Sequence, residues 1–314
     1  MLGAGGVAGI AWHAGVLAGL QDATGFDART ADVIVGTSAG SITGATLRAG
    51  VPAADLFALA TGQALTPEGA ALHARIRTSE GFTATARSST MRRPANPGLL
   101  RALAPWDRRP LVALAGLLPA GAIDTGSIAV RVDELAGLGG RWPEQPLWIV
   151  AVDLGSGRRV VFGRDEAPQA SSLGAAVAAS SAVPGLFAPV VDDGVRYIDG
   201  GVHSTTNADL AVGLGHDLVI VSAPMAGRWR SLRAHPASMS RTSARVSLDR
   251  EVSAIRRDGT RVLVLQPGPD DTPIMDGAAM DPRRRRPIAE QARKSTIVSF
   301  ARPQVADVVG LLRS

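Results

Sequence analysis

Apolar positions along the chain follow two spacings, one typical of helices and one typical of short buried strands. Residues 10–20 predict a helix of small and apolar residues. Residues 32–35 form a short apolar run that predicts a strand, and a helical pattern resumes over 41–49. A strand between two loop–helix units predicts a βαβ arrangement, and therefore parallel strands.

The second half of the chain returns to strand spacing after a less regular stretch. Residues 147–153 predict a strand, and a Gly-Ser-Gly turn connects it to 159–162 in a hairpin. Between about 51 and 145, Pro and Gly clusters interrupt helical stretches, which predicts a helical insertion that covers or flanks the site. Further strands are predicted at 195–198, 217–222 and 261–266, an alanine-rich helix at 173–181, and a terminal helix after the arginines at 283–286.

These elements predict a single α/β domain over residues 1–314. We expect three layers, with a mainly parallel central sheet flanked by helices. The domain would include the helical insertion at about 51–145 and an Arg-rich C-terminal segment at about 281–314.

Composition narrows the classes of partner. Lys and Arg number 33 against 28 Asp and Glu, and aromatics make up 4%, too few for a base-stacking platform, so we expect no nucleic acid partner. The absence of cysteine excludes disulfides and a Cys nucleophile. No signal-peptide pattern follows Met1, and the most apolar window, 111–122, is too short to span a bilayer. We therefore expect a cytoplasmic protein.

Gly36-Thr37-Ser38-Ala39-Gly40 is the strongest chemical signal, because it lies directly between a predicted strand and a predicted helix. A serine in such a sharp turn needs small neighbours, which let the backbone fold tightly and leave the hydroxyl exposed. The hydroxyl would lie over a helix N-terminus, where backbone N–H groups favour developing negative charge. The alternative is a turn that only caps the helix through Ser38 or Ser41. The context favours a nucleophile.

The glycine-rich loop at 3–9 is ambiguous by itself. Its successive N–H groups suit an oxyanion or a phosphate, and its spacing also fits a dinucleotide fingerprint. A dinucleotide site needs an acidic residue at the end of the second strand. Asp22 and Asp27 precede that strand, and the serine motif occupies its end, so this reading is disfavoured.

A nucleophilic serine needs a base, and the sequence favours Asp199. The α/β-hydrolase order of Ser, acid and His requires several strands before the nucleophile, and at most two precede Ser38. Of the five histidines only His203, near Asp199-Gly200, has a context that singles it out, and we expect all five at the surface or in caps. Asp199 ends a predicted strand and is followed by two glycines, which would let its carboxylate approach another loop.

The ordered set of the glycine loop, Gly-Thr-Ser-Ala-Gly and Asp199-Gly200-Gly201 resembles the patatin-like phospholipase family. The residues at 184–189 and the Val-Asp-Leu at 152–154 before a hairpin are also similar to the family pattern. The likeness covers about residues 1–50 and 147–225, and the region between is not diagnostic.

The resemblance implies a Ser–Asp dyad without histidine, in which Ser38 attacks an ester carbonyl and Asp199 takes its proton. It also implies an oxyanion hole of backbone N–H groups from Gly5, Gly6, Val7 and Ala39. No cofactor or metal is expected.

Two positions depart from the family pattern. Ala8 stands where members often carry Arg or Lys, which reduces positive charge near the oxyanion. Only Met1 and Leu2 precede the loop, so either the true start lies upstream or the first strand is nearly absent and supports the loop weakly.

The sequence therefore predicts a hydrolase of lipid acyl esters, of phospholipase or lipid acyl hydrolase type. Two rivals remain: an esterase or thioesterase without lipid preference, and a non-catalytic protein that binds anions or nucleotides in the glycine loop. Residues 99–103 and 111–118 are apolar blocks on either side of Trp106-Asp107-Arg108-Arg109, which suit a lid or a peripheral membrane contact, or else an ordinary helix pair.

Overall fold

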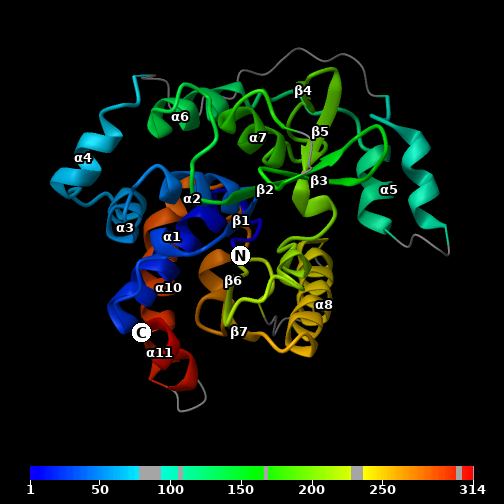
Figure 1. Ribbon diagram of the computed structural model, residues 1–314. Coiled ribbons are helices and arrows are strands. Elements are labelled where there is room, and N and C mark those ends of the chain that lie inside the picture. The colour runs from blue at the N-terminus through cyan, green and yellow to red at the C-terminus, as the bar shows by residue number, and fades with distance from the viewer. Residues whose placement is uncertain (78–92, 105–108, 166–168, 228–235, 302–305, 314) are drawn as a thin grey trace.

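A central sheet organises the computed structural model, which describes residues 1–77, 93–104, 109–165, 169–227, 236–301 and 306–313 (Figure 1). The strand predictions hold apart from small shifts at the ends, and one short strand, β4, was not expected. The strands are β1 (Ile34–Thr37), β2 (Leu147–Asp153), β3 (Arg159–Phe162), β4 (Val190–Asp192), β5 (Val195–Asp199), β6 (Leu218–Ser222) and β7 (Arg261–Leu265).

Helices cover both faces of this sheet. One face packs against α1 (Gly6–Thr24), α2 (Ala39–Arg48), α6 (Gly126–Ala136), α7 (Leu173–Ser180) and α10 (Arg285–Phe300). The opposite face packs against η2 (Pro97–Leu103), α5 (Pro110–Leu117), η4 (Ala208–Ala211) and α8 (Pro236–Arg257). The other helical segments are η1 (Ala28–Thr30), α3 (Ala53–Thr61), α4 (Pro67–His73), η3 (Gly200–Val202), α9 (Thr272–Met275), η5 (Pro282–Arg284) and α11 (Ala306–Arg313).

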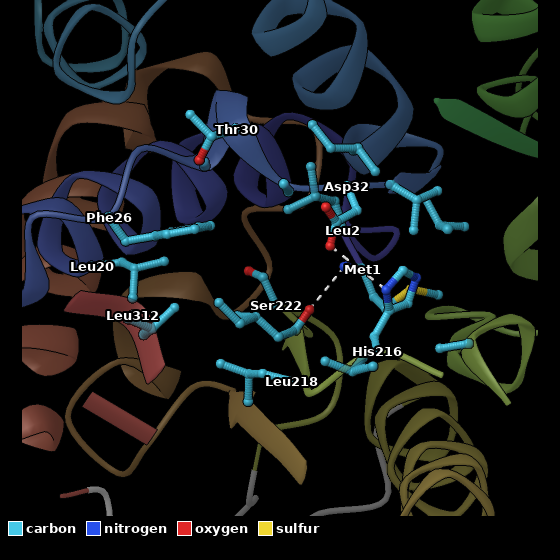
Figure 2. Close-up of a pocket in the computed structure, with 18 of the residues that line it drawn as sticks. Met1, Leu2, Leu20, Phe26, Thr30, Asp32, His216, Leu218, Ser222 and Leu312 are labelled. Carbon is cyan, nitrogen blue, oxygen red and sulfur yellow. Dashed lines mark hydrogen bonds and ion pairs between the residues drawn. The ribbon is translucent and has the colours of Figure 1, made fainter. Parts of the chain in front are cut away.

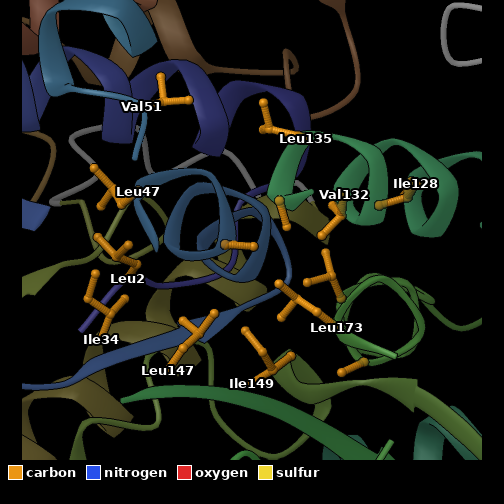
Figure 3. Packing of buried hydrophobic residues seen from close by; sticks show 14 of the residues in the cluster. Leu2, Ile34, Leu47, Val51, Ile128, Val132, Leu135, Leu147, Ile149 and Leu173 are labelled. Carbon is orange, nitrogen blue, oxygen red and sulfur yellow. The ribbon is translucent and has the colours of Figure 1, made fainter. Parts of the chain in front are cut away.

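Strand β2 shows why the sheet lies between two helical layers. Leu147 and Ile149 point into the cluster formed with α1, α2, α6 and α7 (Figure 3), whereas Val152 packs against η2 and α5 on the other face. All three side chains are fully buried. A strand that is covered on both faces is a continuous apolar run, as residues 147–152 are.

The sheet is mixed, so the prediction of a mainly parallel sheet is wrong in part. Strand β2 pairs in parallel with β1, and β6 with β7. Strands β3 and β5 both run antiparallel to β2, and β4 runs antiparallel to β5. The hairpins β2–β3 and β4–β5 account for β3 and β4, because a short turn between neighbouring strands reverses the chain direction, whereas β5 reaches β2 through a long connection and runs antiparallel to it.

A short extended stretch at the N-terminus joins the two groups of strands. The Leu2 N–H donates to the Val35 carbonyl at 2.8 Å, and the Gly3 N–H donates to the Ser222 carbonyl at 2.9 Å. Leu2 thus bridges β1 and β6 in parallel. The glycine loop that follows is held at the carboxyl ends of two strands, although a full first strand does not precede it.

The register of β2 brings two distant loops together. Ile149 pairs with both β1 and β3, and Ala151 pairs with both β3 and β5. Since a strand has two edges, β1 and β5 share the edge opposite β3. Strand β1 ends opposite Val150 and β5 ends opposite Ala151, running in opposite directions. Their carboxyl ends therefore meet.

No helix in the described part of the chain combines the length and apolar character that crossing a bilayer requires.

Candidate active site

Ser38 lies in a tight turn between β1 and α2, as the sequence predicts. Its backbone has φ 54° and ψ −117°, a region that residues other than glycine rarely adopt. A Cβ on Gly36 would lie 2.6 Å from the Gly40 carbonyl oxygen, and a Cβ on Gly40 would collide with the Leu2 carbonyl. The two glycines of the motif are therefore required by close backbone contacts, and the turn resembles a nucleophile elbow.

Ser180, at the end of α7, holds this turn from behind. The Ser38 N–H donates to the Ser180 hydroxyl oxygen at 2.9 Å, and the Ser180 hydroxyl donates to the Val150 carbonyl at 2.6 Å. Ser180 is fully buried. One side chain thus fixes the elbow relative to β2, a role that the sequence analysis missed.

Asp199 ends β5 and faces Ser38, as the register of β2 requires. Its carboxylate accepts the Gly201 N–H at 2.7 Å, and Asp199 and Ser38 line the same cavity. Asp199 is 4% exposed and Ser38 is 5% exposed. Burial raises the pKa of Asp199 to about 6, although the hydrogen bonds from Ser38 and Gly201 act in the opposite direction. A carboxylate with this pKa is a stronger base than a solvated one and is still ionised at neutral pH.

The glycine loop turns into α1 beside this pair. The Ala4 N–H donates to the Thr205 carbonyl at 2.7 Å, which fixes the loop against the segment after Asp199. Gly6 has φ 61°, and a Cβ there would meet the Ala279 carbonyl at 2.5 Å, so only glycine fits. Gly5 is the N-cap of α1 and no side chain caps the helix.

Four residues were predicted to supply oxyanion donors. Gly5 and Gly6 line the same cavity as Ser38 and Asp199, whereas Val7 and Ala39 do not. Within the described residues, no protein acceptor is recorded for the N–H groups of Gly5, Gly6 and Val7. Ala39 is the first residue of α2, directly after Ser38. The arrangement leaves donors available at two helix N-termini.

A cavity of about 530 Å³ opens over Ser38 and Asp199. This volume falls within the usual range for small-molecule sites. Its lining is largely apolar and comes from α5, the segment after α7 and the loop after α9; it includes Leu111, Leu114, Leu118, Val183, Leu186, Met275 and Met280. Arg241, Ser243 and Ser247 of α8 give one side a polar and basic character. The cavity suits a molecule with a long apolar part and a polar end.

The sequence profile of patatin-like phospholipases matches residues 1–212, about two thirds of the chain. The chain belongs to the patatin-like phospholipase family. This family comprises lipid acyl hydrolases, and its matched region contains both Ser38 and Asp199. Among solved structures, VipD from Legionella pneumophila is similar at 15% identity and a TM-score of 0.39. The alignment covers 93% of this chain and 66% of that chain, just under two thirds of its length.

His13 supports the glycine loop of this patatin-like chain. The prediction that all histidines lie at the surface or in caps is wrong for His13, which is fully buried. Its Nε2–H donates to the Gly3 carbonyl at 2.8 Å, so its Nδ1 accepts from the Ser222 hydroxyl at 2.8 Å. Burial lowers the pKa of His13 to about 4, which keeps the ring neutral. A histidine inside the apolar run of α1 was the available signal.

A second cavity of the chain, about 310 Å³, lies apart from Ser38 and Asp199 (Figure 2). It opens between α1, the start of β1 and β6, and neither Ser38 nor Asp199 lines it. The Met1 amino group donates to the Ile220 carbonyl at 2.8 Å within it, and burial lowers the pKa of that amine to about 5. His216 and Asp32 face each other at 3.6 Å at its edge. Ser222, whose hydroxyl donates to the buried His13, also lines it.

We expect Ser180→Ala to lower kcat about tenfold with little change in KM, and to cost about 1–3 kcal/mol of stability, because the buried Ser38 N–H and Val150 carbonyl lose their partner. Ser181→Ala is the matched control. Its hydroxyl is also buried but makes no hydrogen bond with the described residues. Thermal unfolding and steady-state kinetics of the two variants test the role, and equal effects in both would contradict it.

Proposed function

We propose that this protein is a serine hydrolase of lipid acyl esters that uses Ser38 as nucleophile and Asp199 as base. Family membership supports lipid acyl hydrolysis at a coarse level. The observation that carries the finer assignment is that Ser38 and the buried carboxylate of Asp199 line one cavity, where burial raises the pKa of Asp199 to about 6.

In the first half-reaction, the Ser38 oxygen attacks the ester carbonyl while its proton passes to Asp199. The carbonyl oxygen becomes an oxyanion, and we place it against the N–H groups of Gly5 and Gly6, with Val7 and Ala39 as further donors. Collapse of the tetrahedral intermediate breaks the bond to the leaving alcohol, which takes the proton from Asp199. An acyl-serine remains.

In the second half-reaction, Asp199 accepts a proton from water as the water oxygen attacks the acyl carbonyl. The same oxyanion donors stabilise the second intermediate. Its collapse releases the carboxylic acid and returns the proton to Ser38. Each proton removed by Asp199 is given back within the cycle, so no cofactor is needed for the balance.

The rival assignment, an esterase or thioesterase without lipid preference, differs in its dependence on chain length. We expect kcat/KM on p-nitrophenyl esters to rise by up to about 15-fold for each pair of methylenes from acetate to at least octanoate, because each buried CH₂ contributes about 0.8 kcal/mol. The apolar side of the cavity supports this expectation. A maximum at acetate or on short thioesters would favour the rival.

A further inference from the structure

The helix α5 is apolar around its whole circumference. Its sequence, Pro-Leu-Val-Ala-Leu-Ala-Gly-Leu, contains no polar side chain. Val112 is fully buried against β2, whereas Leu111, Leu114 and Leu117 are 38%, 52% and 42% exposed. A short helix without a polar face is normally buried in a core or placed in a lipid environment.

The segment η2 packs beside α5 and repeats this division. Leu99 is fully buried, whereas Leu100 and Leu103 are 44% and 55% exposed. The five exposed leucines of η2 and α5 form what we term the leucine face. Leu59 of α3 is the only other leucine as exposed in the described residues. Large exposed apolar patches mark sites of interaction.

The leucine face is continuous with the cavity over Ser38. Leu111 and Leu114 are exposed and also line that cavity. Met280 lines it as well and is 41% exposed. A lipid that leaves a bilayer at this face would keep its acyl chain among apolar side chains all the way to Ser38.

A basic groove adjoins the leucine face. It is lined by Arg109 at the start of α5 and by Arg250 of α8, and it shares Leu111 with the cavity. No described residue that lines it is acidic. Arg101 of η2 is also exposed and donates to the Gly155 and Ser156 carbonyls. At an anionic membrane interface, leucines can enter the acyl-chain layer while arginines contact the negatively charged head groups.

We infer that the leucine face and the basic groove dock the protein onto an anionic lipid surface and orient the cavity toward it. The inference rests on the proposed function, because docking there serves delivery of a lipid to Ser38. The docked surface comprises η2, α5 and the neighbouring part of α8, which lie together at one side of the molecule (Figure 1). The segment 105–108, with Trp106, Asp107 and Arg108, lies outside the described residues and is not part of the argument.

The test uses the full chain and two kinds of vesicle, pure phosphatidylcholine and an equal mixture with phosphatidylglycerol. We expect wild type to co-sediment with the mixed vesicles, more weakly at high salt. The double variant Leu103→Ser/Leu117→Ser should lose at least about tenfold in binding, since each leucine loses apolar burial. Neither residue lines the cavity, so hydrolysis of soluble p-nitrophenyl butyrate should stay unchanged while vesicle hydrolysis falls with binding.

A matched control places the same kind of change elsewhere. Leu59→Ser/Val298→Ser alters exposed positions on α3 and α10, which lie on the side of the molecule opposite α5 in Figure 1. This variant should bind vesicles as wild type does. Arg250→Gln should weaken binding to the mixed vesicles about fivefold, since a basic residue near an anionic surface contributes about 1 kcal/mol, and should not change binding to pure phosphatidylcholine.

Three outcomes separate the possibilities. If Leu103→Ser/Leu117→Ser binds vesicles as strongly as wild type does, the docking inference is overturned. The inference is also overturned if wild type is a dimer that does not bind vesicles and the same variant is a monomer. That result would assign the leucine face to a second copy of the chain. Vesicle binding that follows the variants, without hydrolysis of any ester, supports docking and instead refutes the proposed function.

Discussion

Ser38→Ala lowers kcat/KM on acyl esters by at least about 10⁴-fold, because removal of a nucleophile also removes the covalent pathway. Residual turnover then comes from binding and oxyanion donors alone. The fold should persist, since the Ser38 N–H retains its bond to Ser180 and alanine removes only the hydroxyl. Steady-state kinetics with a p-nitrophenyl ester, together with thermal unfolding, measures both effects.

Ser181→Ala is again the comparison, because it removes a buried hydroxyl close to the elbow that makes no hydrogen bond with the described residues. It should retain activity within about twofold, as an uncoupled substitution does. Turnover by Ser38→Ala at more than a few per cent of wild type would mean that the nucleophile lies elsewhere.

Asp199→Asn lowers kcat by at least about 10³-fold, because an amide cannot accept the Ser38 proton. The pH profile gives a second readout. In the proposed mechanism Asp199 must be ionised, and burial raises its pKa to about 6, so wild-type kcat/KM should rise through that pH and level off above it. The residual activity of the variant should lack this inflection. Asp193→Asn, at an exposed turn with φ 46°, is the control, since asparagine tolerates that conformation.

Asp199→Asn should also stabilise the protein at neutral pH. Between pH 3.8 and 6, the native carboxyl of Asp199 keeps a proton that the unfolded chain has released, so native stability falls as pH rises through this window. Above pH 6, the difference between 3.8 and about 6 lowers the free energy of unfolding by about 3 kcal/mol. Asparagine carries no such penalty and its oxygen still accepts the Gly201 N–H.

Thermal unfolding should therefore show a higher Tm for Asp199→Asn at pH 7.5 and a much smaller difference near pH 4. Asp193→Asn should leave Tm unchanged at both values. A lower Tm for Asp199→Asn at neutral pH would mean that the carboxylate is not destabilised by burial.

The sequence could single out Ser38 and Asp199 as candidates because each is marked by a local pattern at the end of a strand. Gly36 and Gly40 around Ser38, and Gly200 after Asp199, are positions where a Cβ would collide with backbone. What the sequence could not specify is the geometry that joins them. The ends of β1 and β5 meet because both pair with one edge of β2, and such pairing depends on register between distant segments.

The mixed sheet escaped prediction for a related reason. Residues 195–199 would suit a strand of either direction, and the antiparallel pairing of β5 with β2 joins segments that are distant in the chain. Ser180 and His13 were missed because their partners, the Ser38 N–H and the Gly3 carbonyl, are brought to them by the fold. A single buried polar residue gives no sign of its partner in the sequence.

The central claim is that the turn holding Ser38 and the carboxylate of Asp199 form one chemical unit. The most direct measurement is the rate at which a fluorophosphonate modifies the protein, followed by intact mass and peptide mapping over a range of pH. A single adduct on Ser38, formed at a rate that rises through pH 6 in wild type and is nearly abolished in Asp199→Asn, is the predicted result. Modification of another residue, or equal rates in both proteins, would contradict it.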